Sequence, residues 1–310
     1  MSTPRIGADV GGTKILIGAI GTEGDVVERA RIATPTGAEA LCRAVADAVT
    51  SLSSFAGQPI GLAMAGRIDP DQRTVRQAAN LGLVNVPLAE LLEQRTQVAV
   101  RLVNDADAAL GAECAFGVAR GCADALMVAV GTGVGGSVAV RGQLVPGAHG
   151  GAGEIGHMVV KLGGRACACG GSGCLDQYGS GRALWRYAKR ANRNRTALPS
   201  DLGAAANAGV PYALEAYDRV GRWLGVGIAN AVALLDPSRI VLAGGVAAST
   251  PILLQTVQRH LFQELRARGV RAAPELALAE LGANAGMIGA ALLSVETATS
   301  LGTGNAGSRG

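Results

Sequence analysis

Residues 5–20 read RIGADVGGTKILIGAI and decide the first part of the fold. Two apolar runs, RIGADV and KILIGAI, flank a short glycine-rich turn, and a third run, VVERARI, follows a Thr-Glu-Gly-Asp turn. Apolar runs separated by such turns predict an antiparallel β-meander over residues 4–33.

The stretch AVGTGVGGSVAV at residues 129–140 repeats this arrangement of strand, Gly-Thr turn and strand. We interpret the pair as a weak internal repeat, in which two loops grip one polyphosphate. Elsewhere buried strands such as PIGLAMAG and VAVRLV alternate with helical patterns, which predicts a mixed sheet covered by helices. The helical patterns span residues 38–54, 87–96, 105–117, 212–235, 251–268 and 284–296.

Composition indicates a large globular protein. The 310 residues are 49% hydrophobic, 17% charged and 3% aromatic, so two lobes with aliphatic cores are expected. The net charge of +4 does not favour nucleic acid, and the basic stretch from Arg182 to Arg195 is interpreted as a solvated helix face. Neither a signal peptide nor a membrane span is expected. The small, polar tail from Thr297 is expected to be disordered.

The turn DVGGTK carries groups that suit a phosphate. The N–H groups of Gly11 and Gly12 can point at phosphate oxygens, Thr13 adds a hydroxyl and Lys14 a positive charge. Asp9 can hold Mg²⁺, directly or through water. The spacing is not that of a Walker A loop, and a plain hairpin turn explains the motif equally well when it is taken alone.

Two further glycine turns suit a nucleotide. Thr132 and Gly133 lie in GTGVGG, and Gly244 and Gly245 lie at a strand-to-helix junction that can seat an adenosine. Ordinary strand–helix packing explains the second turn equally well.

Asn104-Asp105 ends the apolar strand VAVRLV. Carboxylates at this end of a strand face the ligand crevice of α/β proteins, so Asp105 can accept the proton of a sugar hydroxyl. Alternatively, Asp105 is an ordinary helix N-cap.

His157, Cys167, Cys169 and Cys174 provide four ligands for a tetrahedral Zn²⁺. Such a set leaves no position for water, which predicts a structural ion. The alternative is four reduced side chains without a metal. Clustered cysteines beside scattered single ones favour a cytoplasmic protein over a disulfide framework.

Taken together, and in this order, these motifs resemble the ROK family of sugar kinases and sugar-responsive repressors. The segments that carry the resemblance are DVGGTK, GLAMAGRID, NLGLVNVPL, NDAD, GTGVGG, GAHGGAGEIGHM and CACGGSGCLDQYGS. They span residues 9–180, and the GGV turn extends the resemblance to residue 246. Ala65 stands where the family's sugar-loop motif usually has proline.

The resemblance implies an α/β, actin-like (ribonuclease H-like), two-lobed ATPase fold with the sugar in an interdomain cleft. Residues 1–117 plus 285–310 are expected to form a smaller lobe with the first phosphate loop and the catalytic Asp105. Residues 118–284 are expected to form a larger lobe with the second phosphate loop, the zinc site and the adenosine turn. The residues implied to bind sugar are Gly66, Asn80, Asn104, Glu154, His157 and Asp176.

The implied activity is ATP-dependent phosphorylation of a hexose at its 6-hydroxyl, with Asp105 as general base. Glucose is the first expected sugar; N-acetylmannosamine, mannose and fructose are alternatives, as is a sugar-binding protein without turnover. Asp176 replaces the family's usual Glu, which leaves the sugar open. The first strand starts near Arg5, which favours a kinase over a repressor with an added DNA-binding domain. A homodimer or homotetramer is expected, and whether polyphosphate replaces ATP stays open.

Overall fold

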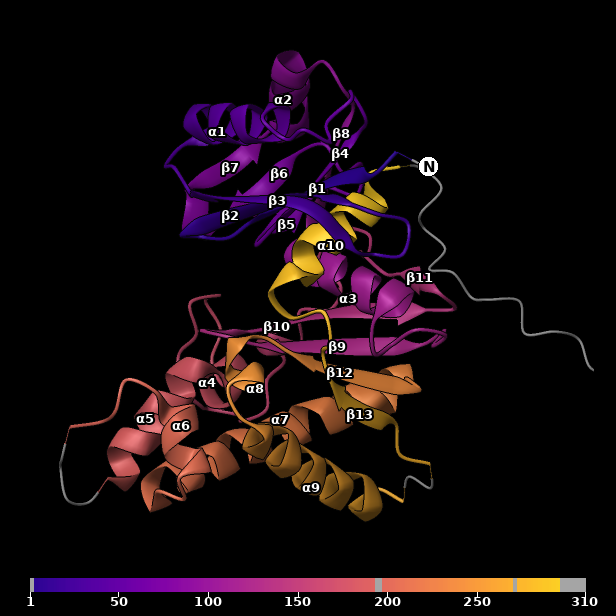
Figure 1. The fold of residues 1–310 in the computed structure, drawn as a ribbon. Helices are drawn as coiled ribbons and strands as arrows, with labels where there is room; N and C mark the ends of the chain where they lie inside the picture. The colour runs from indigo at the N-terminus through magenta and orange to yellow at the C-terminus, as the bar shows by residue number, and fades with distance from the viewer. Residues whose placement is uncertain (1–2, 193–196, 270–271, 296–310) are drawn as a thin grey trace, which may run out of the picture. The chain divides into compact units, whose positions relative to one another are not determined.

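The computed structural model describes residues 3–192, 197–269 and 272–295, which fold into two compact units of mixed α/β structure (Figure 1). Unit 1 consists of Met1–Ala123, Ser137–Ala152 and Ala283–Gly310, and unit 2 consists of Asp124–Gly136 and Gly153–Gly282. Relative to the expected lobes, the segment Ser137–Ala152 groups with the N-terminal unit. The tail from Thr297, together with Arg193 and Arg195, lies outside the described residues.

Unit 1 is built on a five-stranded sheet, and the predicted β-meander forms three of its strands. The strands are β1 (Arg5–Val10), β2 (Lys14–Ile20), β3 (Val26–Ala33), β4 (Ile60–Met64) and β8 (Val100–Asn104). Their spatial order is β3-β2-β1-β4-β8. β1 pairs antiparallel with β2 but parallel with β4, which pairs parallel with β8. The carboxyl ends of β1, β4 and β8 therefore meet at one edge of the sheet.

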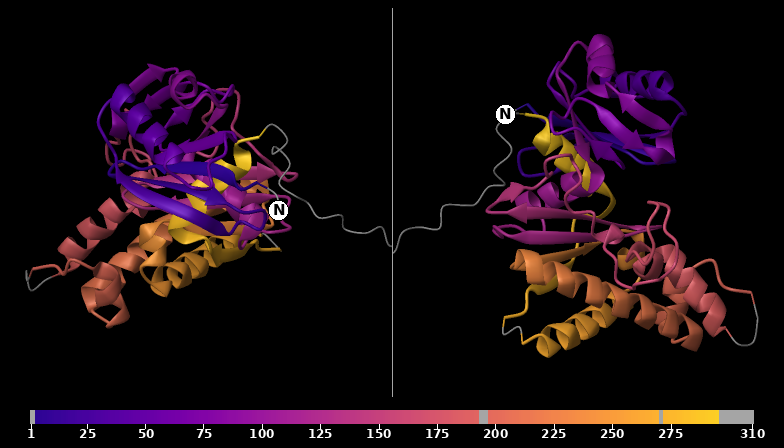
Figure 2. Two further views of the ribbon diagram at one scale, coloured as in Figure 1. Left: turned by 45° about the horizontal axis from the view of Figure 1, so that its top comes forward. Right: turned by 180° about the vertical axis from the view of Figure 1, so that it is seen from behind.

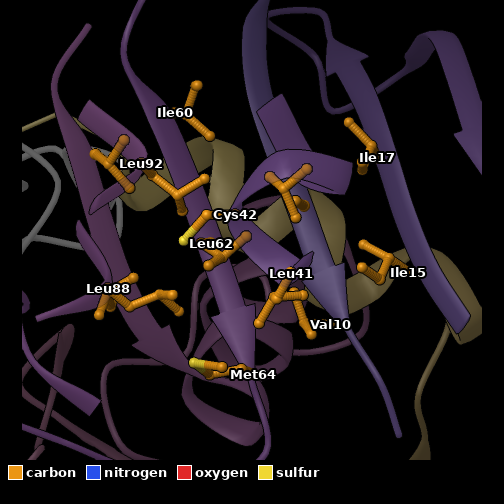
Figure 3. Packing of buried hydrophobic residues seen from close by; sticks show 14 of the residues in the cluster. Val10, Ile15, Ile17, Leu41, Cys42, Ile60, Leu62, Met64, Leu88 and Leu92 are labelled. Carbon is orange, nitrogen blue, oxygen red and sulfur yellow. The ribbon is translucent and has the colours of Figure 1, made fainter. Parts of the chain in front are cut away.

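One face of this sheet carries the main aliphatic core. Alternate residues of β1 (Ile6, Ala8 and Val10) are buried there, because successive side chains of a strand point to opposite faces. They belong to one cluster with Leu41 of α1 (Ala38–Thr50) and Leu92 of α2 (Leu88–Thr96). Figure 3 shows this packing, which is aliphatic as the composition predicts.

The opposite face lies so close to a helix that it needs glycine. α10 (Ala285–Leu293) packs against β1 and β4, and against α3 (Asp105–Phe116). A Cβ on Gly7 would lie 2.0 Å from the Met287 carbonyl oxygen, and one on Gly61 would lie 1.8 Å from that of Ala290. Neither position accepts a larger residue without displacing the helix backbone.

A small three-stranded sheet in unit 1 was not predicted. It contains β5 (Arg67–Ile68), β6 (Val75–Ala78) and β7 (Leu83–Val86), with the 3₁₀ turn η1 (Ala79–Leu81) between the last two. This sheet follows Gly66 directly, and η1 carries Asn80.

The second five-stranded sheet repeats the strand order of the first. Its strands are β9 (Ala125–Val130), β10 (Val134–Val140), β11 (Gln143–Leu144), β12 (Arg239–Ala243) and β13 (Glu275–Leu278). The spatial order is β11-β10-β9-β12-β13, so the first three strands form a meander and the last two are parallel additions, as in unit 1. The duplicated topology supports the internal repeat inferred from the two Gly-Thr turns.

The helices of unit 2 lie between Asp176 and Ala267. They are α4 (Asp176–Gly179), α5 (Gly181–Ala191), α6 (Leu202–Asn207), α7 (Pro211–Leu235), α8 (Gly245–Ala248) and α9 (Pro251–Ala267), with 3₁₀ turns η2 (Ile155–His157) and η3 (Gly282–Asn284) near the unit's ends. Proline at N1 starts both long helices, α7 and α9. Figures 1 and 2 show these two helices side by side, and a Cβ on Gly221 of α7 would lie 2.4 Å from Thr256 Oγ1 of α9.

None of the helices in the described ranges combines the length and apolar character needed to cross a membrane.

Candidate functional site

Two carboxylates meet at the carboxyl edge of the first sheet. Asp9 is the last but one residue of β1, and Asp105 follows the end of β8. The pKa of Asp9 is raised to about 6, first by burial and then by the negative charge of Asp105, while the positive charge of Lys14 opposes both effects. The two acids are therefore close enough to influence each other, as expected for groups at the same sheet edge.

Asn104, rather than Asp105, is the N-cap of α3. Its Oδ1 accepts hydrogen bonds from the N–H groups of Ala106 at 2.9 Å and Asp107 at 3.2 Å. The alternative that Asp105 is the N-cap is therefore wrong. Asp105 is the first residue of the helix, where the helix dipole favours a negative charge, and its Oδ1 accepts from Ala106 N–H at 3.0 Å.

Asn104 also joins the predicted sugar residues of unit 1. Its Nδ2 donates to the Gly66 carbonyl oxygen at 3.0 Å. Gly66 has φ +152°, and a Cβ there would lie 2.5 Å from the Gln77 carbonyl oxygen, so this position requires glycine. The close approach holds the start of the small sheet next to the end of β8.

The first phosphate loop is a tight turn with an exposed tip. Gly11 N–H donates to the Lys14 carbonyl oxygen at 3.0 Å, and the Thr34 hydroxyl donates to the Gly11 carbonyl oxygen at 2.7 Å. Gly12, like Thr13 and Lys14, is exposed. A Cβ on Gly12 would lie 3.8 Å from the Cβ of Asn80, so a predicted phosphate residue and a predicted sugar residue are neighbours.

Unit 2 brings the other two nucleotide turns together. Within the second phosphate loop, Gly131 N–H donates to the Gly133 carbonyl oxygen at 2.9 Å, and Thr132 is exposed. Gly244 has φ +92°, and a Cβ on it would lie 2.5 Å from the carbonyl oxygen of Val130, directly before that loop. The exposed backbone of Gly244 and of its neighbour Gly245 thus adjoins the loop.

The predicted metal ligands form one cluster. One candidate ligand atom from each of His157, Cys167, Cys169 and Cys174 lies within 4.8 Å of all the others. Hydrogen bonding from the backbone of Gly171 lowers the pKa of the Cys169 thiol, whereas burial and the neighbouring thiols raise the pKa of Cys174. Three cysteines and one histidine at this spacing suit a closed tetrahedral Zn²⁺ site.

The two ring nitrogens of His157 lie near different groups. Its Nδ1 lies 3.7 Å from Cys167 Sγ, and its Nε2 lies 3.9 Å from a carboxylate oxygen of Glu154. One ring nitrogen is thus directed at the thiol cluster and the other at a predicted sugar residue, and the side chains of His157 and Glu154 are both about half exposed. A metal on the first nitrogen would fix the orientation of the second.

The predicted sugar residues divide between the two units. Unit 1 holds Gly66, Asn80 and Asn104, and unit 2 holds Glu154 and His157. The contacts shown join Asn104 to Gly66 and His157 to Glu154, whereas Asn80 lies beside Gly12.

Asp176 differs from the other predicted sugar residues. It is buried, and its carboxylate accepts hydrogen bonds from Val134 N–H at 3.0 Å and from Arg182 at 2.7 Å. It lies against the second phosphate loop.

Arg182 was not singled out in the sequence, where it formed part of a basic helix face. Its backbone N–H approaches the Thr132 carbonyl oxygen at 3.5 Å, and its guanidinium binds Asp176. The sequence Ser180-Gly181, which follows the cysteine cluster, could have indicated its position. Ser180 is the N-cap of α5, so Arg182 lies in the first turn of that helix.

Comparison with known proteins gives consistent matches over nearly the whole chain. The sequence profile of the ROK family matches residues 5–297. A glucokinase of Streptomyces coelicolor is 35% identical over 310 residues, covering 94% of this chain and 97% of that protein. An N-acetylmannosamine kinase of Escherichia fergusonii is 34% identical over 290 residues, covering 92% and 96% respectively.

Among solved structures, a ROK family glucokinase from Streptomyces griseus in complex with glucose and AMPPNP superposes with a TM-score of 0.83. It is 33% identical, and the match covers 93% of this chain and 98% of that one.

Proposed function

Because the chain belongs to the ROK family, we propose that it is an ATP-dependent hexose kinase that converts glucose and ATP to glucose 6-phosphate and ADP. The observation that carries the proposal is the meeting of Asp9 and Asp105 at the carboxyl edge of the first sheet. A phosphoryl transfer needs one group to orient the attacking hydroxyl and another to hold the charge of the polyphosphate, and this edge offers both.

Asp105 serves as the general base. It accepts the proton of the sugar's 6-hydroxyl as the bond to the transferred phosphoryl group forms. Since that proton leaves late in such reactions, the main contribution of Asp105 is to orient the hydroxyl. Its position at the first turn of α3, beside the anchored Asn104, gives it a fixed orientation.

Asp9 and the loop DVGGTK hold the polyphosphate with Mg²⁺. The residues fit a cation, because the pKa of Asp9 is raised by burial and by a second negative charge, and a bound divalent ion relieves both costs. When bound, Mg²⁺ neutralises charge that develops on the phosphate oxygens. Within unit 2, we assign Thr132 and Gly133 to phosphate binding and Gly244 and Gly245 to the adenosine.

A structural Zn²⁺ is held by His157, Cys167, Cys169 and Cys174. The support is the donor set and its spacing within 4.8 Å. The ion supplies no step of the reaction; it fixes the ring of His157, whose Nε2 then binds a sugar hydroxyl together with Glu154.

N-acetylmannosamine is a second candidate substrate, favoured by the 34% identity to a kinase of that sugar. A coupled assay of ADP release across a panel of glucose, N-acetylmannosamine, mannose and fructose tests both. We expect the highest kcat/KM with glucose. Turnover with none of the four sugars contradicts the kinase proposal, and a preference for N-acetylmannosamine replaces glucose with the second candidate.

Two properties stay predictions. A homodimer or homotetramer is expected, which light scattering can test. A cytoplasmic location is expected for a protein whose six cysteines are not joined in disulfides and whose proposed co-substrate is ATP.

A further inference from the structure

The carboxylate of Asp176 is engaged inside unit 2. The residue starts α4, and only 6% of its surface is exposed. Oδ1 accepts from the Val134 N–H at 3.0 Å, and Oδ2 accepts from Arg182 at 2.7 Å and from Gln177 Nε2 at 3.1 Å. Both oxygens therefore already have donors, in a setting where a buried charge needs such partners.

The same carboxylate lies directly against the tip of the second phosphate loop. A Cβ on Gly133 would lie 2.7 Å from Asp176 Oδ1. A glutamate at position 176 would carry its carboxylate one methylene further, and Gly133 occupies the space in front of it. The shorter aspartate is the acidic side chain that fits this gap while it binds Val134 N–H.

Backbone hydrogen bonds also hold the loop, and the longest of them runs from Arg182 N–H to the Thr132 carbonyl oxygen at 3.5 Å. Gly131 N–H donates to the Gly133 carbonyl oxygen, and Gly181 N–H donates to the Gly131 carbonyl oxygen, each at 2.9 Å. Those two bonds join neutral groups. The bond from Val134 to Asp176 involves a charge, which makes it roughly twice as strong as a neutral one. Asp176 thus makes the strongest hydrogen bond to the loop, at the end that leads into β10.

We propose that Asp176 is a positioning residue for the nucleotide: it holds the second phosphate loop in its binding shape through Val134 N–H and Arg182, and it does not contact the sugar. The proposal rests on the proposed function of this loop in binding ATP. It also means that the change from the usual Glu to Asp at this position affects the affinity for the nucleotide rather than the choice of sugar.

Steady-state kinetics of Asp176→Ala and Asp176→Asn, with ATP and glucose varied in turn, test the proposal. We expect Asp176→Ala to raise the KM for ATP by about tenfold or more, because a charge-assisted hydrogen bond is lost, and to leave the KM for glucose within about twofold. Asn keeps an acceptor for Val134 N–H, so Asp176→Asn should restore most of the affinity, with a KM for ATP raised about two- to fivefold.

Asp201→Ala is the matched control. Asp201 caps α6 and accepts backbone N–H bonds from Gly203 at 2.8 Å and Ala204 at 3.0 Å, so it is an acidic residue of the same type in the same unit. Its substitution should lower stability and leave both KM values unchanged. Should Asp176→Ala fail to fold, Asp176→Asn takes its place, together with hydrogen–deuterium exchange of a peptide covering residues 131–136. We expect faster exchange of this peptide in Asp176→Asn than in Asp201→Asn, which carries the same substitution at the control position.

The possible failures are distinguishable. A wild-type protein that turns over no hexose contradicts the proposed function. An active wild type whose Asp176 variants raise the KM for glucose, or change neither KM, overturns the positioning role alone. Unchanged exchange over residues 131–136 overturns it as well.

Discussion

At the scale of single residues, the candidate site contains a carboxylate in surroundings that disfavour its negative charge. Asp9 is part-buried beside a second acid, yet it is placed where a cation-bearing substrate can compensate for its charge. Such perturbed groups concentrate at functional sites because catalysis needs them there. The carboxylates of Asp9 and Asp105 are therefore the residues whose substitution should separate stability from activity.

Asp105→Asn should keep the fold and lose the reaction. Asn preserves the shape and the acceptor for Ala106 N–H but cannot take up a proton, so kcat should fall by about 10²–10⁴-fold. The control is Asp107→Asn, two residues further along α3, where the carboxylate accepts from the Ser137 hydroxyl at 2.5 Å. That variant should keep kcat within about tenfold. Activity of Asp105→Asn close to wild type would refute the assignment of the base.

Asp9→Asn should stabilise the protein in the absence of nucleotide and added Mg²⁺. The pKa of Asp9 is raised from 3.8 to about 6, so between these values the folded state binds more protons than the unfolded chain. Stability from this group is therefore lost as the pH rises from about 4 to about 6. Asn carries no charge and avoids the loss, which amounts to roughly 1–3 kcal/mol.

Urea unfolding at about pH 4.5 and about pH 7.5, on either side of most of this titration, measures the effect. The advantage of Asp9→Asn over wild type should be small at the lower pH and largest at the higher one, and turnover with ATP should be lost. Asp47→Asn, on the exposed side of α1, is the control and should show no such pH dependence. An advantage that does not change with pH would contradict the proposed role of burial and of the Asp105 charge.

At the scale of elements, the segment between Glu154 and Asp176 has little regular secondary structure. Backbone hydrogen bonds of turn type hold it, such as those from Val160 N–H to the Gly173 carbonyl oxygen at 2.9 Å and from Gly173 N–H to the Arg165 carbonyl oxygen at 2.8 Å. The 3₁₀ turn η2 and the short helix α4 bracket the thiol cluster. A metal ion bound by four side chains of this segment would add to those backbone bonds. We therefore expect loss of a proposed zinc ligand to reduce the order of the segment, including the side of His157 that is proposed to bind sugar.

Metal analysis should find about one zinc per chain. Cys169→Ser should lose most of it and lower the melting temperature by roughly 5–10 °C, which corresponds to about 2–4 kcal/mol for a unit of this size. The KM for glucose should rise as well, because His157 loses its orientation. Cys122→Ser removes a thiol outside the cluster and should keep the zinc. A wild-type protein without metal would contradict the site.

Elements with long or strongly apolar patterns could be predicted from the sequence, whereas very short ones could not. α7, α9 and the meander were predicted close to their observed bounds. The sheet β5-β6-β7 was missed because its strands have two to four residues, too few for an alternating pattern to emerge.

The part of the candidate site that lies in local sequence motifs could be predicted. The four candidate metal ligands and the carboxyl-edge residues lie in recognisable local patterns. The partners of Asp176 do not, because Val134 lies 42 residues away in the chain and its N–H meets the carboxylate through tertiary packing alone. The alternative that Asp105 is the N-cap was wrong because Asn104, one residue earlier, has an equally suitable side chain. Asn104 accepts the hydrogen bonds from the N–H groups of Ala106 and Asp107.

At the scale of the whole molecule, the two sheets share one strand order, β3-β2-β1-β4-β8 and β11-β10-β9-β12-β13. The predicted actin-like α/β fold is confirmed by the solved ROK family structure to which the chain is similar. In both sheets a Gly-Thr turn joins the first two strands, so each unit presents one phosphate loop from an equivalent position.

The place of α10 has a consequence for how the protein is made. This helix is the last element in the described part of the chain, yet it covers the glycine-lined face of the sheet that β1 begins. At about 5–20 residues per second, a ribosome needs roughly 10–40 s to travel from Asn104 to Ala285. Throughout that interval, the first sheet lacks the helix that covers one of its faces in the folded protein. We therefore expect a chain truncated before Ala285 to leave the face of β1 and β4 that α10 covers exposed.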